Sequence, residues 1–356
     1  MFWLEAVISG IIGIVLGVIL QEPIKRFVDK VVRFFDKLFT TKKMTNEGFR
    51  FGNKETAVRF LDGNGRKEYE SIEVGVVNDI CDGGEFGEEV KYFYEATIAE
   101  LDKEREEGHS KTEWDGLELA LRTYSIGRSE ANESMLLNLA LARNTHFKTK
   151  SVITKLNDVC QLTNRRLIDY IEHYDFEAAG YYDLPNSIGV CLQVFTKDFY
   201  TIFGRRSDVC SYRAGEYDVS VVEAFRNDDI VNEKVDVWAV ARRACCEELC
   251  ELADNEMQIH LLGITFDKEY AQWNIIGVVN LTITCEELLT RRNSGVDGRW
   301  ETKEINPVKN NLEDVIKDVV SHKIWDTGLA TVYYSMLYQM HTRDRINKVI
   351  EKYQKK

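Results

Sequence analysis

Two adjacent glutamates and an arginine at helical spacing are the residues of this chain that come closest to a catalytic arrangement. Arg243, Glu247 and Glu248 lie in the stretch 241–250, which reads ARRACCEELC. Residues three and four positions apart share one face of a helix, so these side chains can lie together. Carboxylates gathered on such a face can hold divalent cations and activate a water, as hydrolysis of a diphosphate link requires. The alternative is an exposed helix face with a salt bridge of little energetic weight.

A second group of residues has the chemistry to hold a nucleotide. Arginine forms bidentate hydrogen bonds with phosphate, and tyrosine can stack on a base. Two arginines end a predicted strand, a tyrosine and an arginine follow closely, and another arginine precedes a second predicted strand; each of them alone is more often a surface residue. The predicted ligand-binding residues are Arg128, Arg205, Arg206, Tyr212, Arg213, Arg243 and Glu247. We predict no catalytic residue and no metal ligand.

The elements that must position these residues are strands interleaved with helices. Apolar, β-prone runs predict strands at 134–141, 187–196, 199–205, 217–223, 257–266, 273–283 and 301–306. Helices are predicted at 86–106, 114–122, 147–159, 163–176, 235–252, 285–290, 310–321 and 327–353. A polar connector is predicted at 44–70. Strands around a central helix, with helices on the flanks, favour an α/β or α+β sandwich of layers.

The composition is that of a folded, acidic protein. The chain has 356 residues, 44% hydrophobic and 29% charged, and a formal net charge of −13. These values exclude wholesale disorder, a polytopic membrane protein and a general binder of nucleic-acid backbones. The eight cysteines contain no Cys-x-x-Cys pair, and several lie in apolar stretches, which indicates a reducing compartment.

The N-terminal end differs from the rest of the chain. Residues 2–20 carry a single charge, Glu5, and as a helix they would span roughly 28 Å, close to the thickness of a bilayer core. Residues 21–43 carry seven basic and three acidic side chains, with apolar residues at helical steps. We therefore predict a transmembrane helix at 1–22 and a basic amphipathic juxtamembrane helix at 23–43. The basic residues place the N-terminus outside and the body in the cytoplasm.

The order of elements around 241–250 resembles a Nudix domain, whose helix carries the motif R-E-U-x-E-E-x-G-U (U apolar) within an α/β/α sandwich. Arg243 stands at the motif arginine, and Glu247 and Glu248 stand at its double glutamate. Ala244 replaces the first glutamate and Cys250 the glycine. Because one of three carboxylates is lost, we predict that the protein is not an enzyme and needs no cofactor, with Mg²⁺ expected only for a hydrolase.

The resemblance implies an α/β (α+β) fold and a division of the body. The α/β/α-sandwich Nudix-like domain is expected at 186–356, preceded by an α+β N-terminal part at 44–185. The layout is similar to that of membrane effectors in bacterial cyclic-oligonucleotide anti-phage systems (CBASS), which join transmembrane helices to a nucleotide sensor.

This second resemblance implies the function. A cytoplasmic domain would bind a cyclic nucleotide second messenger, and the single-pass protein would oligomerise with its copies and disrupt the inner membrane. The expected partners are thus the nucleotide and the lipid bilayer, and no DNA or RNA polymer. The alternatives are a membrane-tethered Nudix hydrolase of a nucleoside diphosphate derivative and a scaffold whose Nudix fold binds only protein.

Overall fold

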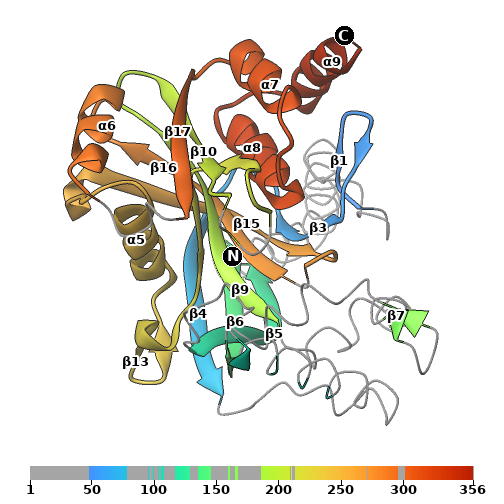
Figure 1. Ribbon diagram of the computed structural model, residues 1–356, viewed down its shortest axis with the longest axis vertical. Coiled ribbons are helices and arrows are strands. Elements are labelled where there is room, and N and C mark those ends of the chain that lie inside the picture. Colours follow the sequence, from blue (N-terminus) through green and yellow to red (C-terminus); the bar gives the residue numbers. More distant parts are fainter. Residues whose placement is uncertain are drawn as a thin grey trace, which may run out of the picture. The chain divides into compact units, whose positions relative to one another are not determined.

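The computed structural model divides the chain into residues 1–47 and residues 48–356. The structure describes 48–77, 117–128, 135–145, 186–208, 213–270, 272–295 and 301–355, together with positions 95, 99, 103, 106–107, 159–160, 165–166 and 210. This part of the chain is mixed α/β (Figure 1).

An eight-stranded mixed sheet is the centre of the second unit. In spatial order its main path is β11 (Tyr217–Val219), β10 (Tyr200–Arg206), β9 (Ser187–Phe195), β16 (Gln272–Leu281), β15 (Met257–Asp267) and β3 (Val58–Gly63). Two further strands, β12 (Val221–Ala224) and β17 (Thr302–Lys309), pair with β9 and β10. Strands β9 and β16 run parallel, and the other pairs of this sheet are antiparallel.

Helices cover both faces of this sheet (Figure 1). Successive side chains of a strand point to opposite faces. On β9, Val190 and Leu192 therefore pack in the apolar cluster of one face, and Cys191 packs in that of the other. The helices on the first face are α5 (Val237–Glu248) and α6 (Cys285–Asn293). Those on the second are α7 (Leu312–Val320), α8 (Asp326–Tyr338) and α9 (Arg343–Gln354).

A second, five-stranded sheet adds to the apolar cluster on the α5 side, where Leu119 and Leu141 belong to it. Its order is β13 (Ile230–Val231), β14 (Lys234–Val235), β4 (Tyr69–Val77), β6 (Met135–Thr145) and β5 (Leu117–Arg128). Two-stranded pairs are formed by β1 (Arg50–Phe51) with β2 (Lys54–Glu55) and by β7 (Val159–Cys160) with β8 (Arg165–Arg166). Strands β3, β4, β5 and β6 thus share sheets with strands that follow residue 185. The division into 44–185 and 186–356 stays a prediction.

Helix α5 begins where the sequence provides a cap. The Asp236 carboxylate accepts hydrogen bonds from the backbone N–H groups of Trp238 (2.9 Å) and Ala239 (3.1 Å). Such a cap satisfies N–H groups that have no partner within the helix. Val240, Ala241 and other residues at three- and four-residue steps are buried, so one face of α5 packs on the sheet.

Most of the elements predicted between 187 and 353 are confirmed. Strands β9, β10, β15, β16 and β17 and helices α5, α6 and α7 lie where they were predicted. The predicted strand 217–223 is two strands, β11 and β12, which separate at Ser220. The predicted helix 327–353 is also two elements, because Thr342 caps a new helix, α9, with its side chain.

Two predictions in the N-terminal part of the body are wrong. The predicted helix 114–122 overlaps β5, which pairs with β6 from Leu117 to Arg128. The predicted connector 44–70 contains β1, β2 and β3, and β3 is bound to β15. In the first case the leucines at 117, 119 and 121 already have the two-residue period of a strand. In the second case pairing with a distant strand outweighs local preference. The predicted strand 134–141 is confirmed as β6, while the predicted helices 86–106, 147–159 and 163–176 lie largely outside the described residues.

The predicted transmembrane helix requires a correction. A membrane span needs a continuous helix of about 20 apolar residues, and none of the helices among the described residues is long and apolar enough. The segments 1–22 and 23–43, for which the transmembrane and juxtamembrane helices were predicted, lie outside the described residues. The predicted single-pass inner-membrane location depended on that helix and is not supported either.

Candidate functional site

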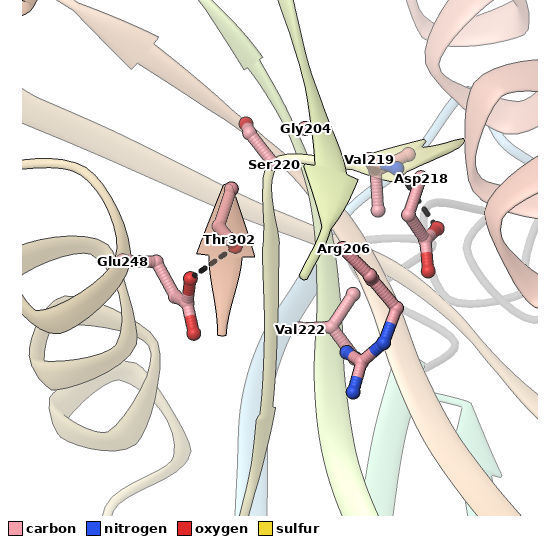
Figure 2. Close-up of a pocket in the computed structure, with 8 residues that line it drawn as sticks. All are labelled: Gly204, Arg206, Asp218, Val219, Ser220, Val222, Glu248 and Thr302. Atoms are coloured by element: carbon pink, nitrogen blue, oxygen red, sulfur yellow. Dashed lines mark hydrogen bonds between the residues drawn. The ribbon is translucent and has the colours of Figure 1, made fainter. Parts of the chain in front are cut away.

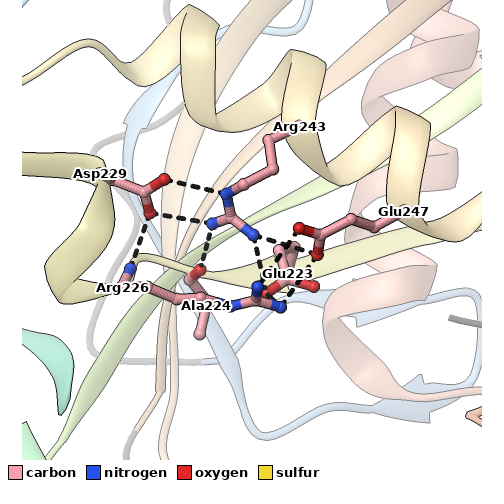
Figure 3. A network of polar contacts seen from close by, with 6 residues as sticks. All are labelled: Glu223, Ala224, Arg226, Asp229, Arg243 and Glu247. Atoms are coloured by element: carbon pink, nitrogen blue, oxygen red, sulfur yellow. Dashed lines mark hydrogen bonds and ion pairs between the residues drawn. The ribbon is translucent and has the colours of Figure 1, made fainter. Parts of the chain in front are cut away.

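Five charged side chains from three neighbouring elements form an ion-pair network beside α5 (Figure 3). Glu223 lies on β12, Arg226 and Asp229 lie in the connection that follows it, and Arg243 and Glu247 lie on α5. Their side chains are partly or largely buried, from 10% exposed for Glu223 to 33% for Arg226. We call this set the α5 network.

Arg243 is the centre of the α5 network. Its Nε and Nη2 atoms donate to the two carboxylate oxygens of Asp229, both at 2.9 Å. Its Nη1 atom donates to Glu247 at 3.2 Å and lies 3.3 Å from Glu223, while Nη2 also donates to the carbonyl of Ala224 at 3.1 Å. Arg243 therefore binds the connection between β12 and α5 to the helix.

Arg226, in the connection before α5, is the second arginine of the α5 network. Its guanidinium donates to both carboxylate oxygens of Glu247, at 3.3 and 2.9 Å, and contacts Glu223 at 2.7 Å. Its backbone N–H donates to Asp229 at 2.7 Å. The three carboxylates of the network thus all contact an arginine, and the five formal charges sum to −1. Burial raises the pKa of Glu223 to about 7, although both arginines oppose the shift.

Glu248 lies outside the α5 network, although it follows Glu247 in the chain. Its side chain is buried, and its Oε2 atom accepts a hydrogen bond from the Thr302 hydroxyl on β17 at 3.0 Å (Figure 2). Its backbone carbonyl accepts from the guanidinium of Arg292 on α6. Burial raises the pKa of this carboxyl well above its usual range, and the nearby Glu301 and Glu223 carboxylates add to the rise.

Ala244 occupies the position of the motif's first glutamate, and it faces the core. It is completely buried and belongs to the apolar cluster of the α5 side, with Val190 and Leu261. The helical spacing to Glu247 and Glu248 is as predicted. However, the side of α5 that carries Ala244 packs on the sheet, so a carboxylate at this position would lie in the apolar core and not beside Glu247 in the α5 network.

A small polar pocket lies next to Glu248, between the end of α5 and strands β10, β12 and β17 (Figure 2). It has room for about one water-sized group, and it is partly open to solvent. The polar residues that line it are Arg206, Asp218, Ser220, Glu248 and Thr302. Arg206 is buried and forms an ion pair with Glu301 at 2.7 Å. We call this the Glu248 pocket.

The predicted ligand-binding residues do not gather at one place. Arg243 and Glu247 meet in the α5 network, and Arg206 lines the Glu248 pocket. Arg205 is exposed and precedes Arg206 on β10, so it points to the opposite face. Arg213 has a fully buried side chain, paired with Asp218 at 2.5 Å and stacked 4.0 Å over the ring of Trp325.

Two of the predicted residues cannot be placed at a site. Arg128 is the last residue of β5, but the structure does not describe its side chain. Tyr212 lies outside the described residues.

Sequence reasoning missed Arg226, Ser220 and Thr302. For Arg226 a signal existed, since it follows Glu223 by three residues in the connection before α5. Ser220 and Thr302 had none, because 82 positions separate them and they reach one pocket through the pairing of β10 with both β11 and β17. Among the residues that the structure describes, no group of three or more His, Cys, Asp or Glu side chains is arranged to hold a metal ion.

Comparison with known proteins adds little to this geometry. The sequence matches no protein-family model and no curated protein. Among solved structures, the crystal structure of DR0079 from Deinococcus radiodurans is 14% identical, and the match covers 44% of this chain and 83% of that one. Its TM-score is 0.29, a likeness too low to carry an argument about fold or function.

Proposed function

We propose that this chain is a non-hydrolysing, Nudix-like protein that binds a cyclic nucleotide second messenger. The observation that carries this proposal is the α5 network, in which two arginines hold the carboxylates that a hydrolase would offer to divalent cations. The membrane disruption expected of an anti-phage effector depended on the membrane helix and is not part of the proposal.

The charges of the α5 network argue against metal-dependent hydrolysis. A divalent cation needs several oxygen ligands at close range. Both oxygens of Glu247 accept hydrogen bonds from Arg226, and both oxygens of Asp229 accept hydrogen bonds from Arg243. A cation entering this site would have to displace a guanidinium or approach two fixed positive charges.

The arrangement of elements and the Glu248 pocket support a nucleotide as the ligand. Helix α5 follows a strand and a short connection and packs on a mixed sheet, the arrangement that the Nudix resemblance implies. At the end of this helix, the pocket presents a guanidinium, two carboxyl groups and two hydroxyls. Polar groups that converge in a small concavity are the usual means of orienting a small-molecule ligand.

Binding and turnover can be measured separately on the full-length protein. We expect saturable binding of at least one cyclic di- or trinucleotide by isothermal titration calorimetry. We also expect no product by chromatography when the same compounds, or nucleoside diphosphate derivatives, are incubated with Mg²⁺ or Mn²⁺. Robust Mg²⁺-dependent turnover that is lost in Glu247→Ala would overturn the proposal in favour of a hydrolase.

Removing Arg226 should convert the α5 network into a cation site. In Arg226→Ala, three carboxylates keep a single arginine; Glu247 Oε1 loses its bond from Arg226, while Oε2 keeps its bond from Arg243. We expect Mn²⁺ affinity to rise about tenfold or more, because a unit positive charge a few ångströms away is lost. The measurement is the free Mn²⁺ signal by electron paramagnetic resonance.

The matched control for this experiment is Arg242→Ala. Arg242 precedes Arg243 on α5, but its contacts are the exposed Asp236 (3.6 Å) and Asp254 (3.9 Å), outside the α5 network. Both variants lose one positive charge, so only the position differs. Equal Mn²⁺ affinity in the two variants would show that Arg226 does not weaken cation binding at these carboxylates.

A further inference from the structure

A buried carboxyl group lies where three segments of the chain meet, at the start of α8. Asp267 is the last residue of β15 and is completely buried. Its Oδ2 atom accepts a hydrogen bond from the Trp325 indole N–H at 2.6 Å. Its Oδ1 atom accepts from the backbone N–H groups of Glu269 (2.8 Å) and Tyr270 (3.3 Å). All three donors are neutral, and Asp267 forms no ion pair with the other residues that the structure describes.

The segment 54–58, which we call the strap, lies beside this carboxyl. Val58 pairs with Asp267 in the ladder of β3 and β15. One residue earlier, the Ala57 carbonyl accepts a hydrogen bond from the Lys268 N–H at 3.1 Å. Release of the strap would break these backbone contacts next to Asp267 and would let water reach its carboxyl.

The strap is also bound to the first turn of α8. The Oδ1 atom of Asp326 lies 2.6 Å from the Lys54 ammonium, and its Oδ2 atom accepts a hydrogen bond from the Ala57 N–H at 2.8 Å. The first unit of the chain ends at residue 47. The strap therefore lies on the covalent path between that unit and the rest of the chain.

The charges around Asp267 favour its neutral form. Burial raises the pKa of Asp267 to about 7, and the Glu269 and Asp326 carboxylates add to the rise, although the hydrogen bonds from the Glu269 N–H and Trp325 oppose it. Opposite Asp267 on β16 lies the neutral Gln272. The basic side chains of the surrounding segments have other partners or another direction: Lys54 binds Asp326, Arg213 binds Asp218, Lys323 binds Glu216, Arg59 stands opposite Phe266 and so points to the other face of the sheet, and Lys268 follows Asp267 in the chain.

We propose that Asp267 is a pH-sensitive clasp on the strap: the strap stays bound to the start of α8 while the carboxyl is neutral, and ionisation of the carboxyl loosens it. The reason is that a negative charge confined in a buried site, next to two further acids, favours any opening that brings it to water. The clasp lies outside the α5 network and does not depend on nucleotide binding.

The test is amide hydrogen exchange of the strap in the full-length protein between pH 5 and pH 8, with each rate divided by the intrinsic rate at that pH. An opening that exposes Asp267 lowers its pKa from about 7 to the ordinary value of about 4, so each opening releases one proton. Protection is therefore greatest at low pH. For the strap amides, among them the Ala57 N–H, it should fall about tenfold per unit from pH 5 to pH 7 and level off above pH 7.

Two variants identify the group that titrates. In Asp267→Asn, the protection of the strap should no longer change between pH 5 and pH 7. Glu269→Gln keeps the backbone N–H that binds Asp267 but removes an exposed acid that raises its pKa, so protection should level off about half a unit lower in pH. Glu223→Gln is the control, because the pKa of Glu223 is also raised to about 7 but this residue lies in the α5 network. It should keep the wild-type response.

The outcomes decide the proposal even if the asparagine variant does not fold. Wild-type protection that stays constant between pH 5 and pH 7 would overturn the clasp, and so would a wild-type response in Asp267→Asn. The exposed position of Glu269 makes Glu269→Gln the safer variant, and a levelling point that does not move in it would also count against Asp267. A fall that is lost in Asp267→Asn, shifted in Glu269→Gln and unchanged in Glu223→Gln would support the clasp.

Discussion

Replacing Ala244 with glutamate is expected to destabilise the protein by roughly 4–7 kcal/mol at pH 8 and not to create a hydrolase. This substitution restores the first glutamate of the Nudix-like motif, but Ala244 is fully buried in the apolar cluster beside the sheet. A carboxyl group buried without a cationic partner has its pKa raised by about 3–5 units, and each unit corresponds to about 1.4 kcal/mol. Since domains are stable by only about 5–15 kcal/mol, most of the folding free energy would be lost.

The control for this prediction is Ala244→Gln, which has the same shape without the ionisable group. A buried glutamate has a higher pKa in the folded state than in the unfolded state. Its cost is therefore smallest below the unfolded pKa of about 4.3 and grows as pH rises toward the folded value. Urea denaturation at pH 5 and pH 8 should show a gap between the Glu and Gln variants that widens with pH. A glutamate variant as stable as its glutamine counterpart at pH 8, or one that gains Mg²⁺-dependent turnover, would contradict this prediction.

Replacing Arg213 with methionine should destabilise the protein by about 3–5 kcal/mol, the typical cost of removing one member of a buried ion pair. The Arg213 side chain is fully buried, and Asp218, its partner at 2.5 Å, is 4% exposed. The variant leaves the buried Asp218 carboxylate without its ion-pair partner and removes the stacking on Trp325. Chemical denaturation measures this loss directly.

Two further variants identify the cause. In Arg213→Met with Asp218→Asn, the unpaired charge is gone, so part of the loss should be recovered; this double-mutant cycle isolates the pair. Arg205→Met is the matched control, because Arg205 is an exposed arginine on β10 and its loss should cost less than about 0.5 kcal/mol. If Arg213→Met keeps wild-type stability and binds a cyclic nucleotide more weakly, then Arg213 is a ligand residue and the structural role assigned to it is wrong.

Several features of this protein could be predicted from local sequence because short-range physics sets them. The nine residues of β9 are all buried, and their largely apolar sequence indicates a strand covered on both faces. Asp236 before an apolar periodic stretch marks the start of α5, and the spacing of Arg243 and Glu247 places them four residues apart on one helix face. These inferences need only the helix and strand periods and the chemistry of a helix cap.

The tertiary structure alone decided what those residues contact. Glu247 and Glu248 are neighbours in the chain, yet they have different partners. Glu247 accepts a hydrogen bond from Arg226, whereas the buried Glu248 side chain accepts one from the Thr302 hydroxyl. The core position of Ala244 depends on which face of α5 lies on the sheet. The sequence by itself determines the periods and spacing of residues within a helix or strand, because these are local properties. The partners of a side chain depend on strand pairing and packing between residues far apart in the chain, and no local pattern contains the free energies of these contacts.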